Sequence, residues 1–162
     1  MVAASATFPA RRSRALRAIF WGGLVAGALD ITYAFVFYGL RNRLSPARIL
    51  QSVASGLLGA DAFKGGLGVA ALGAALHFLI AFTAAAVYYA ASRRLNFLLR
   101  HAVTCGVVYG VLIYALMNYV VVPLSAAPPR GTPPPVVLVT GLLVHMFFIG
   151  LPIALFARRY SR

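Results

Sequence analysis

The sequence predicts an all-α protein: a four-helix transmembrane bundle with one short amphipathic helix, interfacial or re-entrant, between the first two spans. Four apolar runs predict the spans, at residues 18–40, 69–91, 103–124 and 136–157. Each run has 22 or 23 residues, enough to cross a hydrocarbon core of roughly 30 Å at about 1.5 Å per residue. The chain is 62% hydrophobic with a mean hydropathy of +0.87, outside the range of an ordinary water-soluble domain.

These four runs occupy more than half of the 162 residues and leave no room for a separate soluble domain. We therefore expect a single transmembrane domain over residues 18–158. A disordered basic tail is expected over residues 1–17, and a short tail over 159–162. The arginine-rich N-terminus is not a convincing signal peptide, because the apolar run after it is too long.

The amphipathic helix is predicted over residues 46–58, in the only long connection. Ser45 can cap the helix, Pro46 suits its first position, and Gly59 ends the pattern. Apolar residues recur on one helical face: Ile49, Leu50, Val53, Ala54, Leu57 and Leu58. A helix of 13 residues is too short to cross the bilayer, so it should lie in the interface or enter the membrane and return.

The remaining connections and one kink also follow from composition. The connection at 92–102 is short and predicts a tight helical hairpin, whereas the proline-rich connection at 125–135 predicts a stiff, extended segment. In the last span, Gly150 and Pro152 predict a kink or local unwinding.

Positive charge is distributed unevenly between the two ends of the predicted bundle. The net charge is +13, and ten of the 15 Lys and Arg residues fall on the side of the termini. This excess predicts cytoplasmic N- and C-termini. The same charges are expected to contact anionic lipid headgroups, and no nucleic-acid partner is expected. Arginine outnumbers lysine 14 to 1, a coding bias that suggests a GC-rich bacterial source and hence the inner membrane.

Each predicted span contains one aspartate, asparagine or histidine: Asp30, His77, Asn118 and His145. Their distances from the span ends place all four in one layer, about 9 to 15 Å from the membrane surface opposite the termini. Because polar groups in hydrocarbon are costly, they should face the interior of the bundle. Glycine and alanine share their helical faces and permit close helix approach. Tyr33 and Tyr114 could join this layer.

Three interpretations of the polar layer follow. The leading one is a non-enzymatic membrane protein in which interhelical hydrogen bonds of the layer specify helix packing. The first alternative is a proton- or ion-coupled transport component, which at four spans would need a homo-oligomer. The second is a membrane redox protein that binds haem or a metal ion, with His77, His145 and Asp30 as ligands. Otherwise no cofactor is expected.

The connection at 41–68 offers weaker candidates. Gln51, on the amphipathic helix, could bind a headgroup. Asp61 is expected to pair locally with Lys64, and a site role is the alternative. The chain contains no glutamate, no G-x-S-x-G motif and no phosphate-binding loop, so the sequence favours no catalytic residue.

Several strings, in order along the chain, resemble an uncharacterised family of small four-span bacterial inner-membrane proteins. They occupy residues 23–30, 48–59, 71–78, 117–128 and 150–154. The resemblance covers about residues 18–158. It implies the four-span topology and a bacterial source, but no activity, ligand or catalytic residue.

Overall fold

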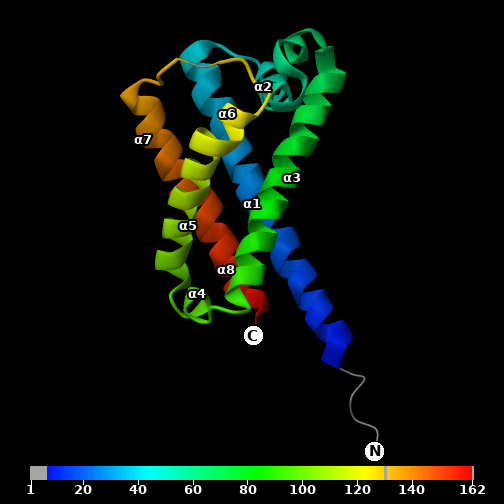
Figure 1. The fold of residues 1–162 in the computed structure, drawn as a ribbon, viewed down its shortest axis with the longest axis vertical. Coiled ribbons are helices and arrows are strands. Elements are labelled where there is room, and N and C mark those ends of the chain that lie inside the picture. The colour runs from blue at the N-terminus through cyan, green and yellow to red at the C-terminus, as the bar shows by residue number, and fades with distance from the viewer. Residues whose placement is uncertain (1–6, 130, 162) are drawn as a thin grey trace, which may run out of the picture.

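The computed structural model describes residues 7–129 and 131–161, with side chains described from Ser13 onward, and its regular elements are all helical (Figure 1). The elements, in chain order, are α1 (Thr7–Asn42), α2 (Pro46–Leu58), η1 (Gly59–Lys64), α3 (Gly66–Ser92), α4 (Phe97–Arg100), α5 (Ala102–Leu116), η2 (Met117–Val121), α6 (Val122–Leu124), α7 (Pro135–Val144), η3 (His145–Gly150) and α8 (Leu151–Tyr160).

The predicted four-span architecture is confirmed. Four helical stretches are long and apolar enough to cross a membrane: Ser13–Asn42, Gly66–Ser92, Ala102–Leu124 and Pro135–Tyr160. The third joins α5, η2 and α6, and the fourth joins α7, η3 and α8. Each predicted apolar run lies within one of these stretches.

The two predicted tails are partly helical. α1 begins at Thr7, so the expected disorder over 1–17 is wrong for residues 7–17, and residues 1–6 lie outside the described part of the chain. Alanine, arginine and leucine are strong helix formers and extend α1 beyond its apolar stretch. α8 likewise continues to Tyr160, because Arg158 and Arg159 in its last turn interact favourably with the helix dipole.

α2 has the predicted bounds and packs inside the protein. The Ser45 side chain accepts a hydrogen bond from the backbone N–H of Arg48, and Gly59 ends the helix with φ 64°. The backbone of α2 at Leu50 approaches Gly73 of α3 so closely that no Cβ would fit. Gly73 lies about 10 Å along α3 from its start. This depth favours the re-entrant alternative over a helix lying on the membrane surface.

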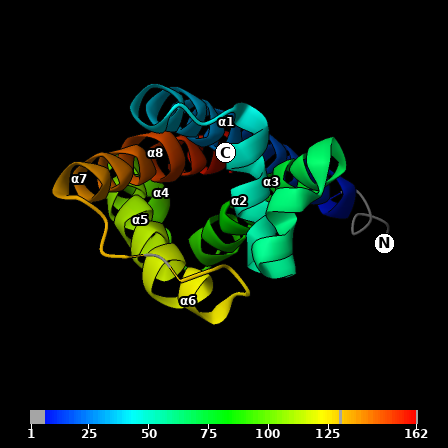
Figure 2. The same ribbon diagram turned by 90° about the horizontal axis from the view of Figure 1, so that it is seen from above.

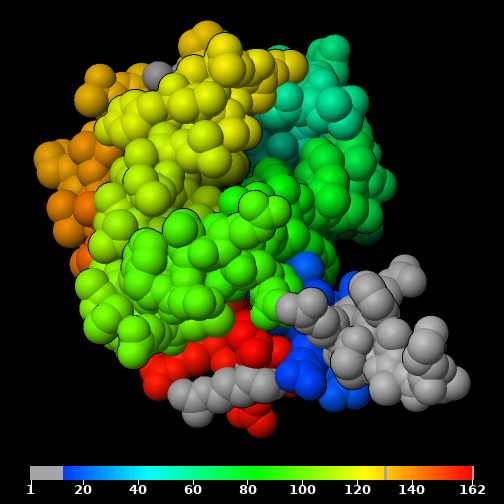
Figure 3. Space-filling view, turned by 60° about the horizontal axis from the view of Figure 1, so that its bottom comes forward, coloured from blue at the N-terminus to red at the C-terminus, as the bar shows by residue number. Residues whose placement is uncertain are grey.

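The bundle is most tightly packed at the end that carries the chain termini. There α8 contacts α1, α3 and α5, and small side chains such as Ala154 and Ala157 are fully buried. The Tyr88 and Tyr109 rings meet edge to face at 5.0 Å between centroids. α4 and the end of α8 lie side by side at this end (Figure 3), whereas the α1–α2 and α6–α7 connections lie at the other (Figures 1 and 2).

Two spans contain a π-helical turn, η2 and η3, and each turn is followed by a proline. Pro123 comes after η2 and Pro152 after η3. A proline has no N–H to donate and its ring clashes with the carbonyl one turn earlier, so the preceding turn widens. The distortion predicted near Gly150 is therefore confirmed, and the one before Pro123 was missed although its cause is the same.

Glycines let α5 lie directly on η3. A Cβ on Gly110 would collide with the backbone carbonyl of His145, and a Cβ on Gly150 would collide with the backbone of Gly106 and Gly110. This contact holds the widened turn of η3 against α5 and thereby fixes the position from which the His145 side chain projects.

We predict that Gly110→Ala destabilises the protein by about 1–3 kcal/mol, because the added methyl group forces α5 and η3 apart. Gly68→Ala is the matched control, since nothing lies within 4 Å of its Cβ position in α3; there alanine is expected to be neutral or mildly stabilising. The measurement is reversible unfolding in detergent. Equal stability of the two variants would contradict the proposed contact.

Candidate functional site

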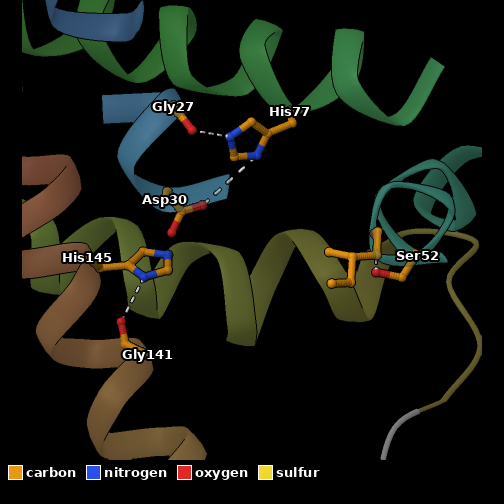
Figure 4. A network of polar contacts seen from close by, with 7 residues as sticks. Gly27, Asp30, Ser52, His77, Gly141 and His145 are labelled. Carbon is orange, nitrogen blue, oxygen red and sulfur yellow. Dashed lines mark hydrogen bonds and ion pairs between the residues drawn. The ribbon is translucent and has the colours of Figure 1, made fainter. Parts of the chain in front are cut away.

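The structure brings together three of the four polar residues predicted to share a layer. Asp30 lies on α1, His77 on α3, and His145 at the start of η3. Figure 4 shows the Asp30 carboxylate between the two imidazole rings, with one oxygen directed toward each. The carboxylate interacts electrostatically with both rings. We call Asp30, His77 and His145 the Asp–His–His cluster.

The His77 ring is held between a backbone carbonyl and the carboxylate. Its Nε2 lies 2.8 Å from the carbonyl oxygen of Gly27, and its Nδ1 lies 4.0 Å from Oδ2 of Asp30. A carbonyl oxygen can only accept, so Nε2 carries the proton of this hydrogen bond. In the neutral ring, Nδ1 is then an unprotonated base that faces the carboxylate.

His145 has the opposite tautomer. Its Nδ1 lies 2.9 Å from the carbonyl oxygen of Gly141, one turn earlier on α7, so Nδ1 is the protonated nitrogen. Figure 4 shows the remaining ring nitrogen, Nε2, on the side that faces Asp30. In the neutral ring this nitrogen too is a base.

The three groups therefore present acceptors to one another. Two basic nitrogens and a carboxylate face each other, and their side chains are largely withdrawn from the surface: 13% of His77 and 23% of Asp30 is exposed. The 4.0 Å separation of Nδ1 and Oδ2 is longer than a hydrogen bond. Facing lone pairs repel one another, and a proton held between two of these groups would relieve that repulsion.

Tyr114 joins the cluster, whereas Tyr33 and Asn118 do not. The Tyr114 ring packs edge to face on His145, at 5.2 Å between centroids. Tyr33 instead stacks on Phe37 of its own helix. Asn118 is exposed and donates to the carbonyl of Tyr114 on its own span. Asn118 lies in η2, where the π turn shifts the helical register that the prediction assumed to be regular.

Gln51 and Asp61, the two candidates in the connection at 41–68, form only local contacts. Gln51 is buried and its Nε2 donates to the carbonyl of Gly66 at 3.0 Å, which ties α2 to the start of α3 and leaves the side chain withdrawn from any headgroup. Asp61 forms the expected exposed ion pair with Lys64, at 2.8 Å. A pair this exposed contributes little to stability.

The geometry does not favour the metal or haem alternative. Among the described residues, no group of three or more His, Cys, Asp or Glu side chains is placed to hold a metal ion.

The sequence analysis missed the two backbone carbonyls that set the histidine tautomers. The Gly141 carbonyl could have been expected, because it lies four residues before His145 on a helix. The Gly27 carbonyl belongs to another helix and becomes available only because Gly27 packs closely on Phe78 and Ala81 of α3. Gly23 and Gly27 lie four residues apart, which indicates a close helix contact but does not identify α3 as the helix that packs there.

Comparison with known protein families, with curated proteins and with solved structures gives no match to this chain.

We predict that His77 keeps a proton on Nε2 and His145 keeps one on Nδ1 in every protonation state of the cluster. Nitrogen-15 chemical shifts of histidine-labelled protein in bilayers report this directly. The signals that disappear in His101→Gln are those of the third histidine. An unprotonated Nδ1 on His145 would show that the Gly141 carbonyl does not set its tautomer.

Proposed function

We propose that this integral membrane protein is a proton-coupled transport component in which the Asp–His–His cluster takes up and releases the proton. The four apolar helices support the membrane assignment. The observation that carries the proposal is the arrangement of the cluster, in which two tautomers fixed by backbone carbonyls present their basic nitrogens to one carboxylate.

The proton path follows from this arrangement. A protonated Nδ1 of His77 donates to the Asp30 carboxylate, which leaves a neutral imidazole and a carboxylic acid. The acid then donates to Nε2 of His145 and forms an imidazolium. A side-chain rotation of Asp30 shortens each separation to hydrogen-bond length when the proton moves. One proton thereby passes from α3 to η3 across α1.

The competing account assigns the polar residues to helix packing alone. A packing role uses hydrogen bonds between helices, and the bond from His77 on α3 to the Gly27 carbonyl on α1 is one of them. His145 instead bonds within its own span, to the Gly141 carbonyl, and the Asp30 carboxylate remains 4.0 Å from Nδ1 of His77, too far for a hydrogen bond. A carboxylate in hydrocarbon costs at least about 2.5 kcal/mol, so this loose arrangement supports proton exchange over packing.

Assembly into a homo-oligomer is part of the proposal. Four spans enclose little space for a transported solute. In the most apolar part of Ala102–Leu124 only 6% of the residues are buried within one chain, the smallest share among the four spans. Its outer face is free to pack against lipid or against a second copy, and chemical crosslinking in the membrane distinguishes these.

Proton flux tests the proposed function. In proteoliposomes with a trapped pH dye and an imposed membrane potential, the wild-type protein is expected to change the internal pH. Asp30→Asn is expected to reduce the flux to that of empty liposomes, because the amide cannot exchange the proton. Asp61→Asn replaces the other, exposed acid and is expected to retain wild-type flux. Equal flux in wild type and Asp30→Asn would refute the role of the cluster.

We place the protein in a bacterial inner membrane with both termini in the cytoplasm, within the four-span family that its sequence resembles. The basic segments before α1, around α4 and after α8 support this orientation. A fluorescent protein fused after Arg162 is expected to fold and fluoresce, whereas a periplasm-dependent phosphatase at the same position is expected to be inactive. The reverse pattern would invert the orientation.

A further inference from the structure

α2 lies on the outer side of the Asp–His–His cluster, at the end of the bundle opposite the termini. Figure 4 shows Ser52 of α2 beyond the cluster, toward the end at which the α6–α7 connection lies. The other end is filled by α8, which packs against α1, α3 and α5. There the hydroxyls of Tyr88 and Tyr109 are also bonded to backbone carbonyls of other segments. The end that α2 covers is therefore the less densely packed route from water to the cluster.

α2 is bound firmly to η1 and to the start of α3. A Cβ on Gly73 of α3 would collide with the backbone of α2, and Nε2 of Gln51 donates to the first turn of α3 at 3.0 Å. The Arg48 guanidinium donates to the Phe63 carbonyl of η1 at 3.0 Å and lies 4.2 Å from the centre of the Phe63 ring. These contacts join residues 46–73 into one body.

α2 touches the end of the third span at few points. The backbone N–H of Ala126 donates to the Gly56 carbonyl at 2.9 Å. A Cβ on Gly56 would lie 3.8 Å from the Ser125 Cβ, an ordinary van der Waals contact. In the described part of the chain, no side-chain hydrogen bond or ion pair joins α2 to α5, η2 or α6. Separation at Ser125 and Ala126 therefore breaks few contacts.

The third span has a built-in bend just before this contact. The π turn η2 is followed by Pro123, so the regular helical hydrogen bonding is interrupted shortly before Ser125. Tyr119 and Leu124 are 72% and 82% exposed, so their side chains do not hold this end of the span against another helix. The end of the span can swing about η2 while residues 46–73 stay fixed to α3.

We propose that the contact of Gly56 with Ser125 and Ala126 is a gate on the outer side of the cluster, which the structure describes in its closed state. Bending of the third span at η2 separates the two sides of the gate. Water and protons then pass along α2 to Asp30. The inference rests on the proposed function, for which it supplies the outer part of the proton route.

A reversible disulfide across the gate tests the inference. The Cβ separation of 3.8 Å at positions 56 and 125 lies within the range of about 3.5–4.5 Å found in disulfides. Gly56→Cys with Ser125→Cys is therefore expected to form one, in a Cys105→Ala background. In proteoliposomes the oxidised protein is expected to lose its proton flux, and reduction is expected to restore it. An oxidised protein with the flux of its reduced form overturns the gate.

A second disulfide is the matched control. A Cβ on Gly22 of α1 would also lie 3.8 Å from the Ala85 Cβ of α3, at the end that carries the termini. Gly22→Cys with Ala85→Cys, in the same background, joins two helices away from the gate. Its oxidised and reduced forms are expected to carry equal flux. Loss of flux on oxidation of this pair too would show that any bond between helices blocks the protein, which overturns the gate.

Chemical modification of Asp30 separates the gate from the proposed function. A water-soluble carbodiimide modifies carboxyl groups that water reaches, and the mass of the peptide containing Asp30 reports the extent. With cysteines at positions 56 and 125, Asp30 is expected to be modified in the reduced protein and protected in the oxidised one. This protection in a protein without proton flux would refute the transport function and support the gate. Equal modification of both forms overturns the gate whatever the flux.

Discussion

The fold is constrained by one carboxylate that hydrocarbon cannot solvate. Asp30 is the single acidic residue within the four spanning stretches, and an unpaired charge at this depth is costly. The bundle meets this constraint by placing an imidazole from α3 and one from η3 on either side of the carboxylate. The helices that carry these groups must therefore converge at one level, and their packing surfaces are built accordingly.

Glycine and proline make that convergence sterically feasible. Gly27 allows α1 to lie against α3, so that the Gly27 carbonyl reaches His77. Gly110 and Gly150 allow α5 to lie on η3. Pro152 accounts for the wide turn that begins at His145. These residues carry no chemistry themselves. They set which ring nitrogen of each histidine faces Asp30, and so bring the three polar side chains together at one level.

The sequence predicts most of this architecture because hydrocarbon imposes simple rules. Span length, the cap and proline that start α2, and the depth of Asp30, His77 and His145 all follow from composition and a constant helical rise. The prediction fails at Asn118, where it assumed a regular helix and η2 changes the register. It also could not find the Gly27 carbonyl or the buried bond of Gln51 to Gly66, since both depend on which helices are neighbours.

The central claim is that both imidazoles face one carboxylate, and a direct distance measurement tests it. The chain has only two aspartates and three histidines, so carbon-13 at the aspartate carboxyl and nitrogen-15 in histidine give a sparse, assignable spectrum. Solid-state dipolar recoupling in bilayers is expected to show the Asp30 carboxyl coupled to nitrogens of both His77 and His145, with Asp61 and His101 uncoupled. An Asp30 carboxyl that shows no coupling to either ring would contradict the account.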